Sequence, residues 1–193
     1  WENLSAKLGN FRLSAYSGEL QKNKTIGVLG ENGIGKTSFV KLLAGLEKPG
    51  TGSISETVKV SYKPQYLETE STALVADLLK GALEKYEINI VRPLELAPLM
   101  TRQLNELSGG ELQRVMIAAC LSKDADVYLL DEPSAYLDIE QRLVLARVIR
   151  DFMEHKGKTA LVVDHDLLFA DYISDKLIVF YGIPGENGQV KGP

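Results

Sequence analysis

Residues 30–37 read Gly30-Glu31-Asn32-Gly33-Ile34-Gly35-Lys36-Thr37, and they follow the pattern G-x-x-x-x-G-K-[ST]. Residues 25–29 before them form a short apolar run, which is typical of a buried parallel strand. Residues 38–45 after them predict a helix that ends at a glycine. A strand, a tight loop and a helix in this order favour a phosphate-binding loop over a glycine-rich turn that binds nothing.

The chemistry of phosphate binding explains the residue types in this loop. Small residues allow backbone N–H groups to turn toward phosphate oxygens, and the start of the following helix adds positive potential. The side chain of Lys36 can reach the β- and γ-phosphates of a nucleoside triphosphate, and the hydroxyl of Thr37 can bind Mg²⁺.

Composition limits the possible classes of protein. The chain has 193 residues, of which 45% are hydrophobic and 25% charged, enough for one sizeable core and a small subdomain. The net charge of −4 gives no basic footprint, so we expect no direct DNA binding. The single cysteine, Cys120, excludes an internal disulfide and a four-cysteine metal site, and its apolar surroundings predict core packing. No apolar stretch approaches a membrane span and no signal peptide opens the chain, so we expect a soluble, cytoplasmic protein without membrane contact.

Two aromatic residues precede the phosphate-binding loop. Residues 1–20 predict edge structure that leads into the strand at 25–29, with Phe11 and Tyr16 as its notable side chains. A purine base bound beside the loop would gain about 1–3 kcal/mol from stacking on an aromatic face. Either residue could instead pack under the sheet, and we rank Phe11 ahead of Tyr16 as the stacking residue.

The middle of the chain predicts a strand end and then a helical insertion. Residues 53–61 favour one or two strands, and Pro64 leaves Gln65 where a polar side chain can meet a metal ion or water. Helices are predicted over 72–85 and, less firmly because of its two prolines, over 91–100. We expect an insertion from Leu67 to about Leu107, within a helical subdomain that covers residues 67–123.

Residues 107–114 combine a helix cap with two glycines. Ser108 and Glu111 form the pattern of a capping box, and the helix it begins continues to about Leu121. Ser108 could be a cap and nothing more. Gly109 and Gly110 argue otherwise, because glycine is a poor helix former unless something approaches the backbone closely. A phosphate at this helix N-terminus would explain both glycines.

Two further strands are predicted to end in acidic or imidazole side chains. Residues 127–130 predict a buried strand that is followed by Asp131 and Glu132, which suit a water-mediated Mg²⁺ ligand and a general base, respectively. Residues 159–163 predict a neighbouring strand, and His165 after it could contact a γ-phosphate or the attacking water. A turn with two acids, or a structural histidine, is the alternative in each case.

The remaining segments carry fewer signals. Asp138 and Gln141 are predicted to open a helix that runs to about His155, which we interpret as a solvated residue near its end. The last strand is predicted over 177–180. Residues 185–191 echo the phosphate-binding loop, but they lack the G-K-[ST] ending and a following helix, and a flexible tail is expected there.

These motifs, in this order, resemble the nucleotide-binding domain of an ABC ATPase. The resemblance covers nearly the whole chain and implies an α/β P-loop NTPase fold with a mostly parallel central sheet, an N-terminal antiparallel β part and the helical subdomain. It implies one ABC domain over 1–193, with ATP and Mg²⁺ bound and ATP hydrolysed, slowly in the isolated domain. The resemblance assigns the following residues: Gly30, Asn32, Gly33, Gly35, Lys36, Thr37, Ser38 and Phe11 to the nucleotide; Thr37, Gln65 and Asp131 to Mg²⁺; Glu132, His165 and Gln65 to catalysis; Ser108, Gly109, Gly110 and Glu111 to the signature; and Ser134 and Asp138 to the D-loop.

A closer resemblance is to the second nucleotide-binding domain of the ribosome-recycling ATPases of archaea and eukaryotes, the RNase L inhibitor family. It rests on residues 61–65, 107–114 and 131–138, and above all on Tyr136 in the D-loop, where transporter domains usually have a small residue. This resemblance implies a translation factor in which ATP closes the domain head to tail on a second nucleotide-binding domain. It also implies the small ribosomal subunit and a release factor as partners. The alternatives are the ATPase subunit of a membrane transporter and a nucleotide-gated interaction module with little hydrolysis.

Overall fold

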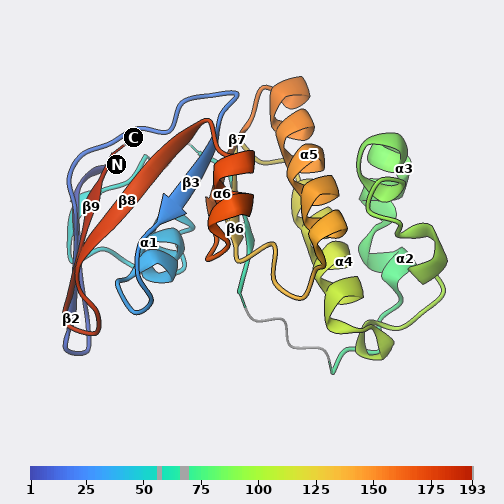
Figure 1. Ribbon diagram of the computed structural model, residues 1–193, viewed down its shortest axis with the longest axis horizontal. Coiled ribbons are helices and arrows are strands. Elements are labelled where there is room, and N and C mark those ends of the chain that lie inside the picture. Colours follow the sequence, from blue (N-terminus) through green and yellow to red (C-terminus); the bar gives the residue numbers. More distant parts are fainter. Residues whose placement is uncertain (56–57, 66–69, 193) are drawn as a thin grey trace.

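The computed structural model describes residues 1–55, 58–65 and 70–192, and a nine-stranded sheet forms the part of the molecule that contains both ends of the chain (Figure 1). The order of the strands is β4-β1-β2-β9-β8-β3-β7-β6-β5. The pairs β3/β7, β3/β8, β6/β7, β5/β6 and β2/β9 are parallel, whereas β1/β2, β1/β4 and β8/β9 are antiparallel. The strands are β1 (Glu2–Leu8), β2 (Phe11–Ala15), β3 (Thr25–Leu29), β4 (Thr51–Ser53), β5 (Val60–Lys63), β6 (Val127–Asp131), β7 (Thr159–Val163), β8 (Lys176–Ile183) and β9 (Asn187–Lys191).

Helices cover both faces of this sheet, and a helical part extends beyond its β5 edge (Figure 1). Side chains of alternate residues of β6 and β7 point to opposite faces, as the period of a strand requires. Leu129 and Leu161 pack with helix α1, whereas Tyr128 and Val162 pack with α4, α5 and α6. The helices are α1 (Lys36–Leu43), α2 (Val75–Leu78), α3 (Lys80–Tyr86), η1 (Glu87–Val91), η2 (Ala97–Leu99), η3 (Leu104–Glu106), α4 (Gly109–Leu121), α5 (Ile139–Lys156) and α6 (Leu167–Ile173).

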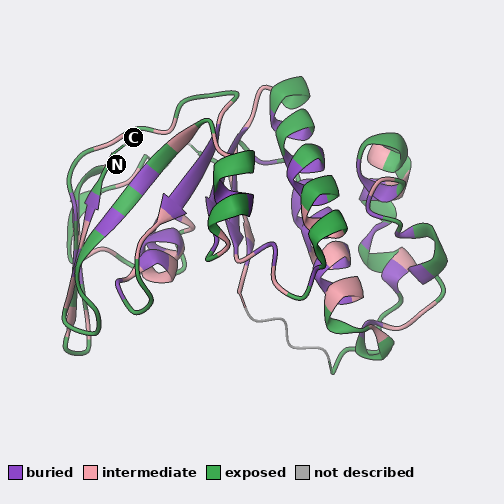
Figure 2. Cartoon of the chain, in the orientation of Figure 1, coloured by how far each residue is buried: buried purple, intermediate pink, exposed green. Residues whose placement is uncertain are grey.

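Burial follows this layering (Figure 2). The central strands β3 and β7 are buried along almost their full length, because both of their faces are covered. Cys120 is buried in α4, as expected from its apolar surroundings, and its carbonyl oxygen accepts a hydrogen bond from Ser61. His155 is exposed near the end of α5, as the sequence predicted.

The predicted strand, loop and helix around residues 30–37 are confirmed as β3, a loop and α1. The parallel strands β3, β7 and β6 lie side by side, with Val28 opposite Val163 and Val163 opposite Asp131. Their C-terminal ends therefore meet at one edge of the sheet, which is where ligands bind in open α/β sheets. The prediction that the strand of His165 lies beside that of Asp131 is confirmed.

The prediction of a flexible tail over residues 185–191 is wrong. Residues 187–191 form β9, which pairs in parallel with β2 and antiparallel with β8. The backbone of this segment therefore pairs with a strand on each side, although its sequence has only a weak strand signal. The predicted edge position of residues 1–20 also needs correction, because β4 lies outside β1, and β9 and β8 lie between β2 and β3.

The helical insertion differs from the prediction in three ways. The helix expected over 72–85 begins only at Val75, because residues 71–75 exchange backbone hydrogen bonds with residues 102–105, and it is divided at Leu79. The helix expected over 91–100 does not form. The π-helix η1 ends at Val91 and the 3₁₀ helix η2 covers only Ala97–Leu99, in a region whose two prolines cannot donate backbone hydrogen bonds. The expected start of the insertion at Leu67 lies outside the described residues.

Candidate nucleotide-binding and catalytic site

A cavity of about 600 Å³ lies at the C-terminal ends of β3, β6 and β7. Most of the predicted nucleotide and catalytic residues line it together. The lining comprises Leu8, Phe11, Asn32, Gly33, Gly35, Lys36, Thr37, Ser38, Gln65, Glu132, Val163, His165 and Gly185. The structure therefore brings together parts of the chain that are far apart in the sequence.

The loop between β3 and α1 turns through glycines with left-handed backbone angles. Gly33 has φ of 73° and Gly35 has φ of 94°, a region that favours glycine. Gly35 also lies against Phe11, since a Cβ built on it would be 2.8 Å from Cε1 of that ring. A side chain at this position would be strained and would displace the aromatic ring.

Lys36 is buried at the start of α1 and points back across the loop. Its Nζ donates hydrogen bonds of 2.7 Å to the carbonyl oxygens of Gly30 and Glu31. Burial lowers the pKa of Lys36, and the negative charges of Glu132 and Asp131 oppose that change. The ammonium group of Lys36 is thus held beside the loop. The phosphate oxygens of a nucleotide could replace the two carbonyl oxygens as its hydrogen-bond acceptors there.

Asp131 is fully buried at the end of β6, and among the described residues neither of its carboxylate oxygens has a well-aligned hydrogen-bond partner. Burial raises the pKa of Asp131, and the neighbouring Thr37 hydroxyl acts in the opposite direction. The contact between this hydroxyl and the carboxylate does not have normal hydrogen-bond geometry. A buried, unpartnered carboxylate beside a threonine hydroxyl provides the hard oxygen donors that Mg²⁺ prefers. These two residues therefore fit a magnesium ion.

Glu132 lines the cavity and is held by residues that follow two neighbouring strands. Its Oε1 accepts a 2.6 Å hydrogen bond from Nε2 of Gln65, which follows β5. Nε2 of His165, which follows β7, lies 2.6 Å from the same oxygen. The three candidate catalytic residues therefore form one connected group.

Sequence reasoning did not assign five residues that line the cavity or contact Glu132. Three of them, Leu8, Val163 and Gly185, line the cavity. Gly185 lies in the turn between β8 and β9, and its N–H donates to the carbonyl oxygen of Gly33 at 3.0 Å. The echo of the phosphate-binding loop around Gly185 was a signal for this residue.

The other two, Lys63 and Gln113, both donate to the carbonyl oxygen of Glu132, at 3.4 Å and 2.7 Å.

The signature residues lie outside the lining of this cavity. The predicted capping box is confirmed: the N–H of Ser108 donates to Glu111 at 2.7 Å, and the Ser108 hydroxyl accepts from the N–H of Glu111 at 3.4 Å. The two glycines have a partner within the chain, because a Cβ on Gly110 would lie 2.8 Å from the carbonyl oxygen of Tyr136. The segment that closely approaches the backbone of these glycines within the chain is therefore the D-loop.

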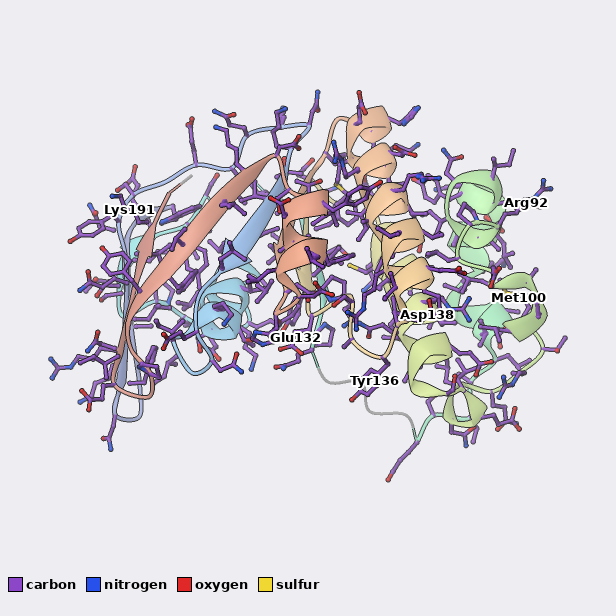
Figure 3. The ribbon with its side chains drawn as sticks, viewed as in Figure 1. Arg92, Met100, Glu132, Tyr136, Asp138 and Lys191 are labelled. Carbon is purple, nitrogen blue, oxygen red and sulfur yellow. The ribbon has the colours of Figure 1, made fainter. Side chains whose placement is uncertain are left out.

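The D-loop connects the site to the signature helix. Tyr136 has φ of 62°, the residue is 74% exposed, and its side chain lies next to Gly109. The hydroxyl and N–H of Ser134 donate to the buried carboxylate of Asp164, at 2.8 and 3.0 Å. Asp138 caps α5 by accepting from the N–H of Gln141 at 2.8 Å, as predicted. Figure 3 shows Tyr136 and Asp138 on the side of Glu132 that faces the helical part.

The two aromatic candidates differ in position. Phe11 lines the cavity and packs against the loop at Gly35. Tyr16 is exposed and does not line the cavity, and its carbonyl oxygen accepts a hydrogen bond from the indole of Trp1. This placement favours Phe11 over Tyr16 as the residue next to a bound base.

The order and geometry of these motifs agree with a family comparison, in which a family model described as ABC transporter matches residues 13–135. The chain belongs to the ABC ATPase family. This ABC ATPase domain therefore binds ATP and hydrolyses it. Among the described residues, no helix combines the length and the apolar composition needed to cross a membrane.

Individual relatives narrow the group of ABC ATPases. An uncharacterized ABC transporter ATP-binding protein of Methanocaldococcus jannaschii is 51% identical over 100% of this chain and 33% of its own length. Translation initiation factor RLI1 of Saccharomyces cerevisiae is 41% identical over 100% of this chain and 33% of its length. The archaeal ribosome recycling factor aABCE1, solved in complex with the ribosomal stalk protein aP1, has a TM-score of 0.95 and 50% identity, covering 100% of this chain and 38% of that chain.

Within the ABC ATPases, the chain closely matches this ribosome-recycling group, also known as the RNase L inhibitor family. The chain spans about a third of the length of these two curated relatives.

Proposed function

We propose that this chain is the ATP-hydrolysing domain of a ribosome-recycling or translation factor, and that ATP closes it against a second nucleotide-binding domain. One ABC domain occupies residues 1–193 in this proposal, with a helical subdomain over about 67–123. The observation that carries the hydrolytic part is the contact of Glu132 with both Gln65 and His165 in the cavity that Lys36 lines. The part in translation is supported by the relatives.

Nucleotide binding is assigned to the loop between β3 and α1. Lys36 neutralises the β- and γ-phosphates, and the backbone N–H groups of the loop turn toward the phosphate oxygens. Phe11 stacks on the adenine, supported by its place in the cavity wall. The residues assigned to the nucleotide are Gly30, Asn32, Gly33, Gly35, Lys36, Thr37, Ser38 and Phe11.

Magnesium is assigned to Thr37 directly, to Asp131 through water, and to Gln65. The described residues contain no group of three or more His, Cys, Asp and Glu side chains that could hold a metal ion by themselves. Binding of Mg²⁺ would therefore depend on the phosphate oxygens of the nucleotide as well. When bound, the ion neutralises charge on the phosphates.

Hydrolysis is assigned to Glu132 as general base. Its carboxylate takes the proton of the water that attacks the γ-phosphorus, while the bond to the leaving ADP oxygen breaks. Gln65 and His165 fix the direction of the carboxylate, because both contact the same oxygen atom. A general base that is held in place by two neighbours loses less freedom in the reaction.

Closure against a second domain gives a role to the predicted signature and D-loop residues, which do not line the cavity. Ser108, Gly109, Gly110 and Glu111 lie at the N-terminus of α4, where they can bind the γ-phosphate of ATP held by a second domain. The D-loop residues Ser134 and Asp138 lie between the two sites. ATP therefore joins the domains, and hydrolysis releases them.

The partners in translation are proposed from the relatives. One of them is named a translation initiation factor, and another is a ribosome recycling factor in complex with a ribosomal stalk protein. Small ribosomal subunits and a release factor are the partners that fit this group, with a cytoplasmic location and neither membrane nor DNA contact. A membrane-transporter subunit would be the alternative, and Tyr136 in the D-loop argues against it.

The test is Glu132→Gln in the full-length protein. We expect ATP turnover to fall about 10²–10⁴-fold, because general-base assistance is lost. ATP affinity should be retained, and the closed form should accumulate with ATP on small ribosomal subunits in sedimentation. Glu140→Gln, an exposed acid at the start of α5, is the matched control. Turnover within a few-fold of the parent would refute the assignment of Glu132, and co-purification with a membrane protein in place of ribosomal subunits would refute the role in translation.

A further inference from the structure

Lys63 is a lysine in the core. It is the last residue of β5 and is only 1% exposed, although lysine is almost never fully buried without a partner. Its Nζ donates to the carbonyl oxygen of Asp131 at 2.9 Å and to that of Glu132 at 3.4 Å. The hydrogen-bond partners of this charge are therefore the backbone atoms that carry the two acidic side chains of the site.

Three acidic side chains, Asp131, Glu132 and Asp164, lie close enough to Lys63 to act on its charge. The hydrogen bond from Nζ to the carbonyl oxygen of Asp131 is buried. A hydrogen bond away from water is electrostatically stronger than one in water.

The backbone at Glu132 needs such support. Its φ of 48° is unusual for a residue with a side chain, so the surroundings must maintain it. The N–H donates to the carbonyl oxygen of Val163 at 2.7 Å, and the carbonyl oxygen accepts from Gln113 and Lys63. The strained turn that directs the carboxylate into the cavity is thus fixed on both sides.

The end of β5 places Lys63 beside this turn. The register pairs Lys63 with Leu130, and β5 ends there. The next residue is Pro64, which has no N–H to donate. The ammonium group of Lys63 donates to the carbonyl oxygens of the two residues that follow Leu130, and the chain continues from Lys63 through Pro64 to Gln65.

We propose that Lys63 is a positioning residue for ATP hydrolysis, whose buried ammonium group holds the carbonyl oxygens of Asp131 and Glu132 and so sets the direction of the Glu132 carboxylate. This inference rests on the proposed role of Glu132. Lys63 acts through the backbone of Glu132 and does not line the cavity. It should therefore affect the rate of the chemical step more than the binding of ATP.

The experiment replaces Lys63 by Met in the full-length protein. Methionine has a similar length but cannot donate a hydrogen bond, and removing one partner of a buried polar contact lowers stability. We expect kcat to fall about 10–100-fold, since small displacements of a catalytic group have effects of this size. The unfolding temperature should fall, while the affinity of the folded variant for a fluorescent ATP analogue should stay within about threefold of the parent. Lys59→Met is the matched control, because Lys59 precedes the same strand and is exposed in an ion pair with Asp124.

A double-mutant cycle with Glu132→Gln separates the two proposals. If Lys63 acts through Glu132, Lys63→Met should lower turnover in the parent and have little further effect in the Glu132→Gln background. A large additional loss in that background would overturn the inference, and so would an unchanged kcat in the single variant.

A loss of stability and of ATP affinity in parallel would show that Lys63 is only structural. If Lys63→Met does not fold, Gln113→Met removes the other donor to the same carbonyl oxygen, and unchanged kcat in that variant would overturn the positioning argument. If Glu132→Gln alone leaves turnover intact, the proposed function fails, whatever Lys63 does.

Discussion

Nε2 of His165 lies 2.6 Å from Oε1 of Glu132, and this contact joins the ends of the neighbouring strands β7 and β6. Gln65 donates to the same oxygen from the end of β5. The carboxylate is therefore oriented by two side chains that belong to different strands. Loss of His165 or Gln65 should make the orientation of the Glu132 carboxylate less fixed, but the carboxylate should still be able to act as a base.

We predict that His165→Ala lowers ATP turnover by about 10–100-fold, because a less well-held base is less effective. Gln65 still contacts Glu132, so the loss should be smaller than that in Glu132→Gln. ATP affinity should change little, since Lys36 and Thr37 remain. The measurement is kcat and KM for ATP, with His155→Ala as the control at an exposed position. A twofold effect or less in His165→Ala would contradict this role.

We predict that Ser108→Arg leaves ATP binding by the separate chain nearly unchanged, because Ser108 does not line the cavity. The large side chain should instead prevent ATP-driven pairing with a second domain. Loss of the cap costs about 0.5–2 kcal/mol by itself, so Ser108→Ala is the control for stability. Equilibrium binding of nucleotide and analytical ultracentrifugation measure the two effects. Weak ATP binding by the dilute Ser108→Arg monomer would contradict the assignment to a second domain's site.

We predict that Gly188→Ala destabilises the contact between β9 and the phosphate-binding loop. A Cβ at this position would lie 2.1 Å from the carbonyl oxygen of Ile34, a backbone atom that cannot move without shifting the loop. Overpacking of this kind costs about 1–3 kcal/mol of unfolding free energy, and ATP affinity should fall with it. Chemical denaturation and nucleotide titration measure both. Gly81→Ala, where nothing lies within 4 Å of the added Cβ, is the control, and equal behaviour of the two variants would refute the prediction.

We predict a pH-dependent contribution of Glu111 to stability. The N–H of Ser108 lowers the pKa of the Glu111 carboxyl from its ordinary value of 4.5, and Arg102 adds to this effect. The unfolded chain therefore binds the proton more readily than the folded one, and the stabilising contribution is present above pH 4.5 and lost as pH falls through the lowered pKa. Glu111→Gln should be less stable than the parent at pH 7, and the two should converge in acid. Denaturation at several pH values measures this, and a constant difference down to strongly acidic pH would contradict it.

Local patterns were sufficient to predict much of the site. The phosphate-binding loop, the caps at Ser108 and Asp138, and the polar ends of the strands at Asp131 and His165 were all recognised from short stretches. Their signals are local because a glycine-rich turn, a helix cap and a strand end each depend on a few consecutive residues. The parallel arrangement then follows from short apolar runs alternating with helices, and it places these ends at one edge.

Only the tertiary structure decided which distant segments complete the site. The sequence of residues 187–191 has no strong strand signal, and these residues become β9 because β2 and β8 offer hydrogen-bonding edges on both sides. That pairing brings Gly185 to the cavity, and the end of β5 brings Lys63 beneath Asp131 and Glu132. Such contacts arise from strand order and side-chain packing across the sheet, which no local propensity encodes. The motifs along the chain therefore determined which chemical groups the candidate site contains, whereas the folded sheet decided how the carboxylate of Glu132 is held.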